Sequence, residues 1–363
     1  MENPLLDRGP PPAFAAIRPE HVEPAIRSVL DENRARIRAL GELAEPTFAS
    51  VVEPLEDMQH RLRRIWSPVG HLNAVLNSPA LRDAYNACLP LLSAYQTDLT
   101  QSEPLYRAYS RILEQEGERL TPTQHRVVEH ALREFRLAGV GLDPQRKARF
   151  KTAMLELTQL QAKFEENVLD ATNAWSHPVG ERGELAGLNE AIVEQARLRA
   201  EEHGARGYLL ALDQPTYVSV LTDAESPALR RAYYEAWNTR ASDQGPQAGR
   251  WDNSAVMESI LGLRHEVARL LDFTSFADYA LATRMASDVP EVVQFLRRLG
   301  TAARPAAERE FAELEAFAGR KLEAWDVSFY SERLQRARFA ISQEQLRGYF
   351  PLPRVLEGLF EAA

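Results

Sequence analysis

The stretch that decides the fold runs over residues 143–175 and reads DPQRKARFKTAMLELTQLQAKFEENVLDATNAW. Its apolar side chains recur at steps of three or four residues, at Phe150, Met154, Leu157, Leu160, Phe164, Val168, Ala171 and Trp175. This spacing places them on one face of an α-helix. A stripe of Met and aromatic residues is compatible with a ligand groove, but packing against neighbouring helices explains it without further assumptions. The stretch therefore predicts a long core helix.

Several helix starts, including that of this stretch, carry one signal: a capping side chain followed by proline at the first helical position. The fixed φ of proline suits that position, and its missing N–H costs nothing there. The signal occurs at Ser78-Pro79, Thr121-Pro122, Asp143-Pro144 and Ser226-Pro227. Gln124 adds a capping box with Thr121. Helical periodicity also covers much of 19–42, 47–66, 79–100, 103–117, 122–138, 187–203, 227–240, 254–271 and 290–319. The sequence thus predicts an all-α protein with at most a few short strands.

One region departs from helical periodicity. Aromatic and β-branched residues at 207–213 and 217–221 flank Gln214-Pro215. Such composition is compatible with two short strands or with a buried connection.

Breaks in the helical pattern predict the domain organisation. The segment 176–183 separates two helical arrays, so we expect an N-terminal array at 1–176 and a second array at 184–363. The segment 243–249 interrupts the second array and is expected to form an ordered loop, because it is too short and mixed in composition for a flexible linker.

The composition is that of an ordinary globular protein. Of the 363 residues, 45% are hydrophobic and 26% are charged, which is enough to bury a sizeable core. The formal net charge of -9 opposes binding to phosphate backbones or anionic lipid, which reward clustered Lys and Arg. We therefore expect neither nucleic acid nor a membrane as a partner.

The sequence also bears on the cellular compartment. Cys88 is the single cysteine, so the chain has no internal disulfide, which suits a reducing compartment. The opening MENPLLD carries acid and proline where a secretory signal needs a basic start and an apolar run. No apolar stretch approaches the ~20 residues needed to cross a bilayer. These features predict a cytoplasmic location.

The histidines offer little support for a local metal site. A zinc hydrolase commonly carries two His one helical turn apart with a Glu between them. His265-Glu266 comes nearest, but Arg269 stands at the second ligand position, where a permanent cation opposes metal binding. The other His residues contain no pair three or four positions apart, and no nucleophile elbow or phosphate-binding glycine loop occurs. We predict no catalytic residue and no metal ligand in this chain, although convergence of distant ligands stays an open alternative.

Many stretches match one known family in the same order along the chain. They are 3–6 (NPLL), 18–22 (RPEHV), 67–73 (SPVGHLN), 166–172 (ENVLDAT), 239–246 (TRASDQGP), 251–254 (WDNS), 263–266 (LRHE), 281–286 (LATRMA) and 345–351 (QLRGYFP). On these stretches the chain resembles the N-terminal half of the thimet oligopeptidase family of zinc metallopeptidases. The family's His-Glu-x-x-His helix and its remaining zinc and substrate ligands would lie beyond Ala363.

The resemblance implies a fold and a function. Complete members form a clamshell of two mostly helical halves around a deep channel with zinc at its floor. This chain is then expected to be an elongated multi-helix array that forms one half and supplies a wall of the channel. Narrow walls admit short unfolded peptides, which become the expected partners together with the missing catalytic half. Zinc is the expected cofactor of the complete enzyme, and none is expected to bind to this chain alone.

Four residues are candidates for the channel wall. Arg240 and Asp243 lie beside the loop at 243–249, and Trp325 and Tyr330 lie near the end of the chain. An arginine is suited to pair a peptide carboxylate in a bidentate fork, and aromatic rings are suited to hold apolar side chains. In the alternative interpretation these residues are structural, with the first pair joining loop to helix and the second pair packed in the core.

Two functional hypotheses remain open from the sequence. In the first, the chain is part of a zinc endopeptidase and is inactive in isolation. In the second, it is a non-enzymatic helical module that binds peptides or a partner, such as a separately encoded catalytic half. In addition, an apolar helix begins at Leu352 and stops without a cap, so we expect its exposed face to promote self-association.

Overall fold

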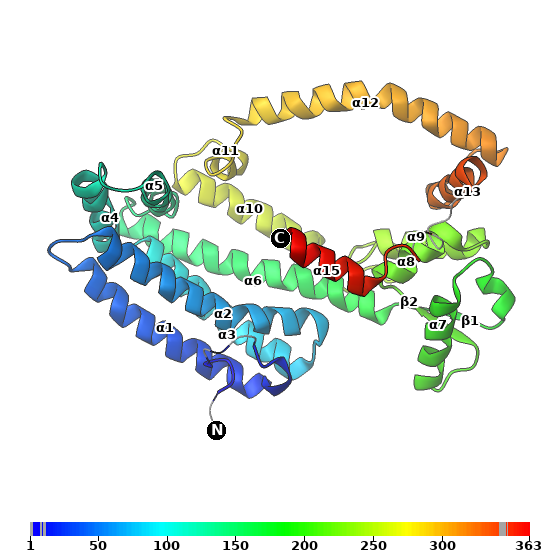
Figure 1. Ribbon diagram of the computed structural model, residues 1–363, viewed down its shortest axis with the longest axis horizontal. Helices are drawn as coiled ribbons and strands as arrows, with labels where there is room; N and C mark the ends of the chain where they lie inside the picture. The colour runs from blue at the N-terminus through cyan, green and yellow to red at the C-terminus, as the bar shows by residue number, and fades with distance from the viewer. Residues whose placement is uncertain (1–2, 8, 10–11, 341–345, 347) are drawn as a thin grey trace. The chain divides into compact units, whose positions relative to one another are not determined.

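The structure is a computed structural model that describes residues 3–7, 9, 12–340, 346 and 348–363 (Figure 1). The described residues are mostly helical and contain one sheet of two strands, which confirms the all-α prediction. They form two compact units, Met1–Lys163 with Val256–Val289, and Phe164–Ala255 with Pro290–Ala363. The predicted division at 176–184 stays a prediction. Positions 345 and 347 of the family-like stretch lie outside the described residues.

Capped amphipathic helices build the first unit. Ser78, Ser102 and Thr121 each accept a hydrogen bond from a backbone N–H three residues on, as N-caps do. Gln124 completes the predicted capping box by accepting from the Thr121 N–H at 3.0 Å. The helices of this unit are α1 (Pro19–Gly41), α2 (Glu53–Val75), α3 (Pro79–Thr100), α4 (Glu103–Glu116), α5 (Pro122–Leu137), the first part of α6 (Pro144–Ala174), nearly all of α10 (Ser254–Leu270) and α11 (Phe276–Leu281).

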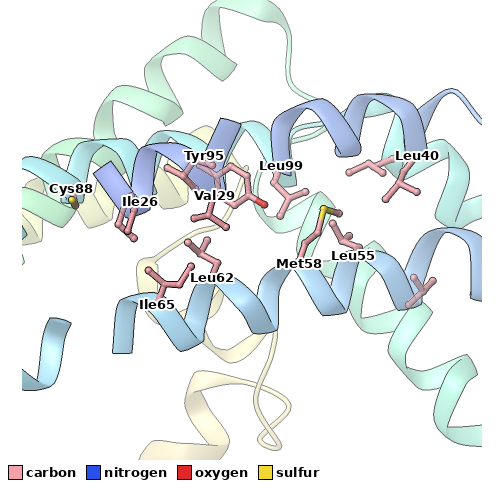
Figure 2. Close-up of a cluster of buried hydrophobic side chains, with 14 of the residues drawn as sticks. Ile26, Val29, Leu40, Leu55, Met58, Leu62, Ile65, Cys88, Tyr95 and Leu99 are labelled. Atoms are coloured by element: carbon pink, nitrogen blue, oxygen red, sulfur yellow. The ribbon is translucent and has the colours of Figure 1, made fainter. Parts of the chain in front are cut away.

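The main core of this unit lies where α1 and α3 meet α2, as Figure 2 shows. Ile26 and Val29 of α1 are completely buried, and Leu62 and Ile65 of α2 are almost completely so. Tyr95 of α3 is buried with them, and its hydroxyl accepts a hydrogen bond from Asn33 Nδ2 at 3.3 Å. The polar tip of the tyrosine is thereby satisfied inside the core.

The predicted stripe on α6 is a packing surface. Phe150 and Leu157 are buried against Ile260, Leu263 and Val267 of α10. The choice between core and ligand groove is therefore settled in favour of core for this part of the stripe.

The second unit begins within α6 and combines short helices with the two-stranded sheet. Its core gathers Trp175, Leu210, Val220 and Tyr233. The elements are β1 (Ser176–Val179), α7 (Glu190–Glu202), β2 (Tyr208–Ala211), α8 (Gln214–Asp223), α9 (Pro227–Asn238), α12 (Val289–Ala318), η4 (Ala324–Asp326), α13 (Val327–Phe339) and α15 (Leu352–Ala362).

For 207–213 and 217–221 the sequence left two alternatives open, two short strands or a buried connection, and the structure matches neither of them fully. The first contains β2, but the second lies inside α8. The Asp213 carboxylate caps that helix by accepting from the Thr216 N–H at 2.8 Å, and a proline follows within two positions. The partner of β2 is β1, which pairs with it antiparallel from Ser176 opposite Ala211 to Val179 opposite Tyr208.

Gly207 is required by the close approach of the two strands. Its φ is +83°, and a Cβ at this position would stand 2.4 Å from the Val179 carbonyl oxygen. Only glycine accepts both the left-handed backbone and this contact.

In the described part of the chain, no helix combines the length and apolar character that crossing a membrane requires.

Replacing Ile26 by Ala is expected to lower the free energy of unfolding by about 2–5 kcal/mol, because the side chain is completely buried and its loss leaves a cavity. Leu76→Ala is the matched control, since Leu76 is 68% exposed. This substitution should change the free energy of unfolding by less than about 0.5 kcal/mol. Urea denaturation monitored by circular dichroism measures both. Equal effects of the two substitutions would contradict the core described here.

Candidate functional site

The partial zinc motif His265-Glu266 forms an ion pair through Glu266 with Arg149. Glu266 accepts two hydrogen bonds from Arg149, from Nε and from Nη2, both at 2.5 Å. This bidentate pairing lowers the pKa of Glu266, although partial burial opposes the shift. His265 points from an exposed position of α10, and Arg269 stands one turn further along.

The described residues do not fit a zinc site. No three His, Cys, Asp or Glu side chains among them are grouped as metal ligands. The only carboxylate of the partial motif is already neutralised by Arg149.

Arg240, the first predicted channel residue, is held at the end of α9. Its Nε donates to the Trp237 carbonyl oxygen at 2.9 Å, and its Nη1 donates to Thr172 Oγ1 at 3.2 Å. The guanidinium lies 3.6 Å from the centroid of the Trp237 ring. Partial burial lowers the pKa of Arg240, although the guanidinium remains charged at any physiological pH. Nη2 has no acceptor among the described residues, so one edge of the fork is available.

Further aromatic rings, from α8, α9 and η4, continue from the contact between Arg240 and Trp237. Tyr217 stacks on Trp237 with ring centroids 4.5 Å apart, and Tyr234 meets Trp325 edge to face at 6.0 Å. All four rings are partly exposed. Burial and the nearby Tyr234 raise the pKa of Tyr217, so its phenol stays neutral. We call these four rings and Arg240 the aromatic–arginine surface.

This surface offers apolar ring faces and one guanidinium edge to a ligand. Flat rings bury apolar side chains at little conformational cost, and an arginine edge pairs with a carboxylate or a backbone carbonyl. Trp325 and Arg240, which were predicted, both belong to it. Tyr217, Tyr234 and Trp237 were missed, and the only signal was the spacing of three between Tyr234, Trp237 and Arg240 along one helical face.

The other two predicted residues lie elsewhere. Tyr330 meets Phe329 edge to face at 5.3 Å, and the Arg320 guanidinium lies 5.5 Å from its ring. Asp243 is exposed in the loop after α9. Gly245 shapes this loop with a φ of +79°, because a Cβ there would clash with Thr239 Oγ1. The structure thus does not bring Tyr330 and Asp243 into the aromatic–arginine surface.

A buried ion pair fixes Trp325 in place. Asp326, next to it in η4, accepts a hydrogen bond from Arg230 Nη2 of α9 at 2.5 Å, and both side chains are 1% exposed. Arg320 Nη2 donates to the second carboxylate oxygen at 2.7 Å. Burial alone would raise the pKa of Asp326, but the hydrogen bonds and charges of the two arginines outweigh it and hold the pKa below its usual value. This pair ties η4 to α9.

Comparisons with known proteins agree with the resemblance seen in the sequence. Residues 26–147 match the model of the neurolysin/thimet oligopeptidase N-terminal domain, and residues 220–363 match that of peptidase family M3. The chain therefore belongs to peptidase family M3.

Within this family the chain is similar to oligopeptidase A. It is 44% identical to oligopeptidase A of Escherichia coli (strain K12) and to that of Salmonella typhimurium, with 99% of this chain and 54% of each relative covered. A probable cytosolic oligopeptidase A of Arabidopsis thaliana is 34% identical, with 99% and 53% covered. The chain spans about half the length of the curated relatives it matches, and it corresponds to their N-terminal half.

Asp326→Asn is expected to lower the free energy of unfolding at neutral pH by about 3–5 kcal/mol, because Arg230 stays buried without its counter-charge. Since the folded pKa of Asp326 is depressed, its contribution is complete above about pH 4 and is lost as the pH falls through the folded value. Urea denaturation over a series of acidic pH values should therefore show that the free energy of unfolding falls less steeply with decreasing pH in the variant than in the wild type.

The matched control is Asp243→Asn, which removes the same charge from an exposed loop and should leave stability within about 0.5 kcal/mol. A variant at Asp326 with wild-type stability and an unchanged acid limb would show that the ion pair does not tie η4 to α9.

Proposed function

We propose that this chain is one part of a zinc-dependent oligopeptidase and that it supplies a wall of the channel through which short peptides reach the zinc. Membership of peptidase family M3 supports the proposal, as does the similarity to oligopeptidase A along the whole chain. No group of three potential zinc ligands occurs among the described residues, and the catalytic residues are proposed to come from the part of such enzymes to which this chain does not correspond. The similarity to a probable cytosolic oligopeptidase A supports a cytoplasmic location.

The observation that carries this proposal is the apolar surface left open on two helices. Leu352, Val355, Leu356, Leu359 and Phe360 of α15 are all more than two-fifths exposed. The helix α12 exposes a second set, at Val293, Phe295, Leu296, Leu299, Phe311 and Phe317. Amphipathic helices normally bury such a face, and open patches of this kind mark an interface. We propose that the catalytic half of the enzyme covers both faces.

The aromatic–arginine surface is the proposed contribution to substrate binding. Its rings accommodate apolar side chains of a peptide, and the free edge of Arg240 pairs with a peptide carboxylate or carbonyl. Tyr330 and Asp243 remain proposed channel residues with no such support from their contacts. A second candidate function, a peptide-binding module without enzymatic activity, is favoured by the same surface, because the surface needs no metal.

The purified chain is expected to cleave no fluorogenic oligopeptide and to hold no stoichiometric zinc, because its described residues supply no ligand group. A fluorescence assay with and without a chelator, together with metal analysis, checks both expectations. Chelator-sensitive hydrolysis by the pure chain would overturn the proposal. Calorimetry with the same peptide tests the aromatic–arginine surface, which both functions share: Arg240→Gln should weaken binding, whereas the stacked control Arg250→Gln should not.

The exposed face of α15 is expected to make the isolated chain self-associate. Leu359→Glu places a charge on this face, where burial in an interface is costly, and should shift the chain towards monomer. Glu361→Gln, at an exposed position of the same helix, is the control and should leave the association unchanged. Sedimentation velocity over a range of concentrations measures the effect. A wild-type chain that is monomeric at the highest concentration would refute the expectation.

A further inference from the structure

The first unit contains a cavity of about 490 Å³ that neither the family membership nor the proposed function explains. It lies among α2, α3, α4 and α5, in the part of the chain that matches the N-terminal domain model. Cavities of roughly 300–1,000 Å³ are the size that small organic ligands occupy. This one is therefore large enough for a ligand of one or two aromatic rings.

The floor of the cavity is apolar and aromatic. Buried side chains from all four helices form it, namely Leu55 and Leu62 of α2, Tyr95 and Leu99 of α3, Tyr109 of α4 and Phe135 of α5. Trp66 of α2 adds a ring near the rim and is itself held by stacking on Tyr85 at 4.8 Å. Such a floor favours a ligand with an apolar body.

One polar group of this floor has its hydrogen-bonding capacity unused in the described part of the chain. Tyr109 is 2% exposed, and its hydroxyl has no hydrogen-bond partner among the described residues. By contrast, the Tyr95 hydroxyl is satisfied by Asn33. This hydroxyl is therefore available to accept a hydrogen bond from a ligand group or a water in the cavity.

Carboxylates stand on two sides of the cavity. Glu56 projects from α2 and Glu134 from α5, and both are exposed at the rim. Both are close enough to Tyr109 to raise the pKa of its phenol further, after the larger effect of burial. Arg63, the only cation on the lining, pairs loosely with Glu56 at 4.0 Å, whereas Glu134 has no ion-pair partner among the described residues. The lining therefore carries a net negative charge.

We propose that this cavity binds a small organic cation, an aromatic or aliphatic body that carries one ammonium group. The body rests on the rings and leucines of the floor, and the ammonium lies between Glu134 and the Tyr109 hydroxyl, which accepts a hydrogen bond from it. The aromatic faces add cation–π attraction to that of the carboxylate. The inference is independent of the proposed peptidase role, because it uses only the first unit.

Three probes that share the indole body and differ in charge test the proposal: tryptamine, tryptophol and indole propionate. Calorimetry with the full chain at low salt is expected to give affinities in that order, with tryptamine the tightest. Glu134→Gln should weaken tryptamine about two- to fivefold, as expected for a rim-exposed charge pair, and leave tryptophol unchanged. Arg63→Gln removes the one cation of the lining and should tighten tryptamine by a similar factor.

A control carboxylate lies outside the cavity lining. Glu118 is exposed, and Glu118→Gln should not affect any of the probes. Leu62→Met, which keeps the apolar floor and the fold, should leave the order of the probes intact. The proposal is overturned if indole propionate binds as tightly as tryptamine, if no probe binds at millimolar concentration, or if the substitutions at Glu134 and Glu118 act alike.

Discussion

An amphipathic helix is stable in water only when its apolar stripe is covered, and this constraint organises the whole molecule. In the first unit the constraint is met internally, because the stripes of α1, α2 and α3 close on one another around Ile26 and Leu62. In the second unit α12 and α15 carry equally apolar faces that the described residues leave open. The same physical rule thus explains the fold of one region and supports the proposal that a partner covers the open faces in the other.

The buried pair of Arg230 and Asp326 shows how a costly interaction acquires a positional role. Desolvating both charges consumes most of their attraction, so the pair contributes little net stability compared with an apolar contact. It does, however, allow only one arrangement of η4 on α9, because each carboxylate oxygen is matched to its own guanidinium. The position of Trp325 depends on that arrangement, and its ring lies edge to face against Tyr234.

Local signals in the sequence were sufficient for most helices and insufficient for contacts between distant residues. Caps and periodicity predicted α3, α5 and α9 to within about two residues, since both signals reside in the helix itself. The β-branched residues of 217–221 left a strand open as one alternative there, whereas the cap at Asp213 starts a helix that contains this segment. The pairing of β1 with β2 and the stacking of Tyr217 on Trp237 join residues that no local pattern connects.

The carboxylates of this chain differ in what surrounds them, and that difference separates structural groups from candidate binding groups. Glu266 is saturated by the two hydrogen bonds from Arg149, and Asp326 is enclosed by two guanidinium groups, so neither has charge left for a ligand. Glu134 stands at the rim of a cavity with no cation paired to it in the described part of the chain. A field that the protein itself does not neutralise is available to an external cation, and a low-dielectric floor beside it strengthens the attraction. Binding is therefore expected where charge is left uncompensated beside apolar surface.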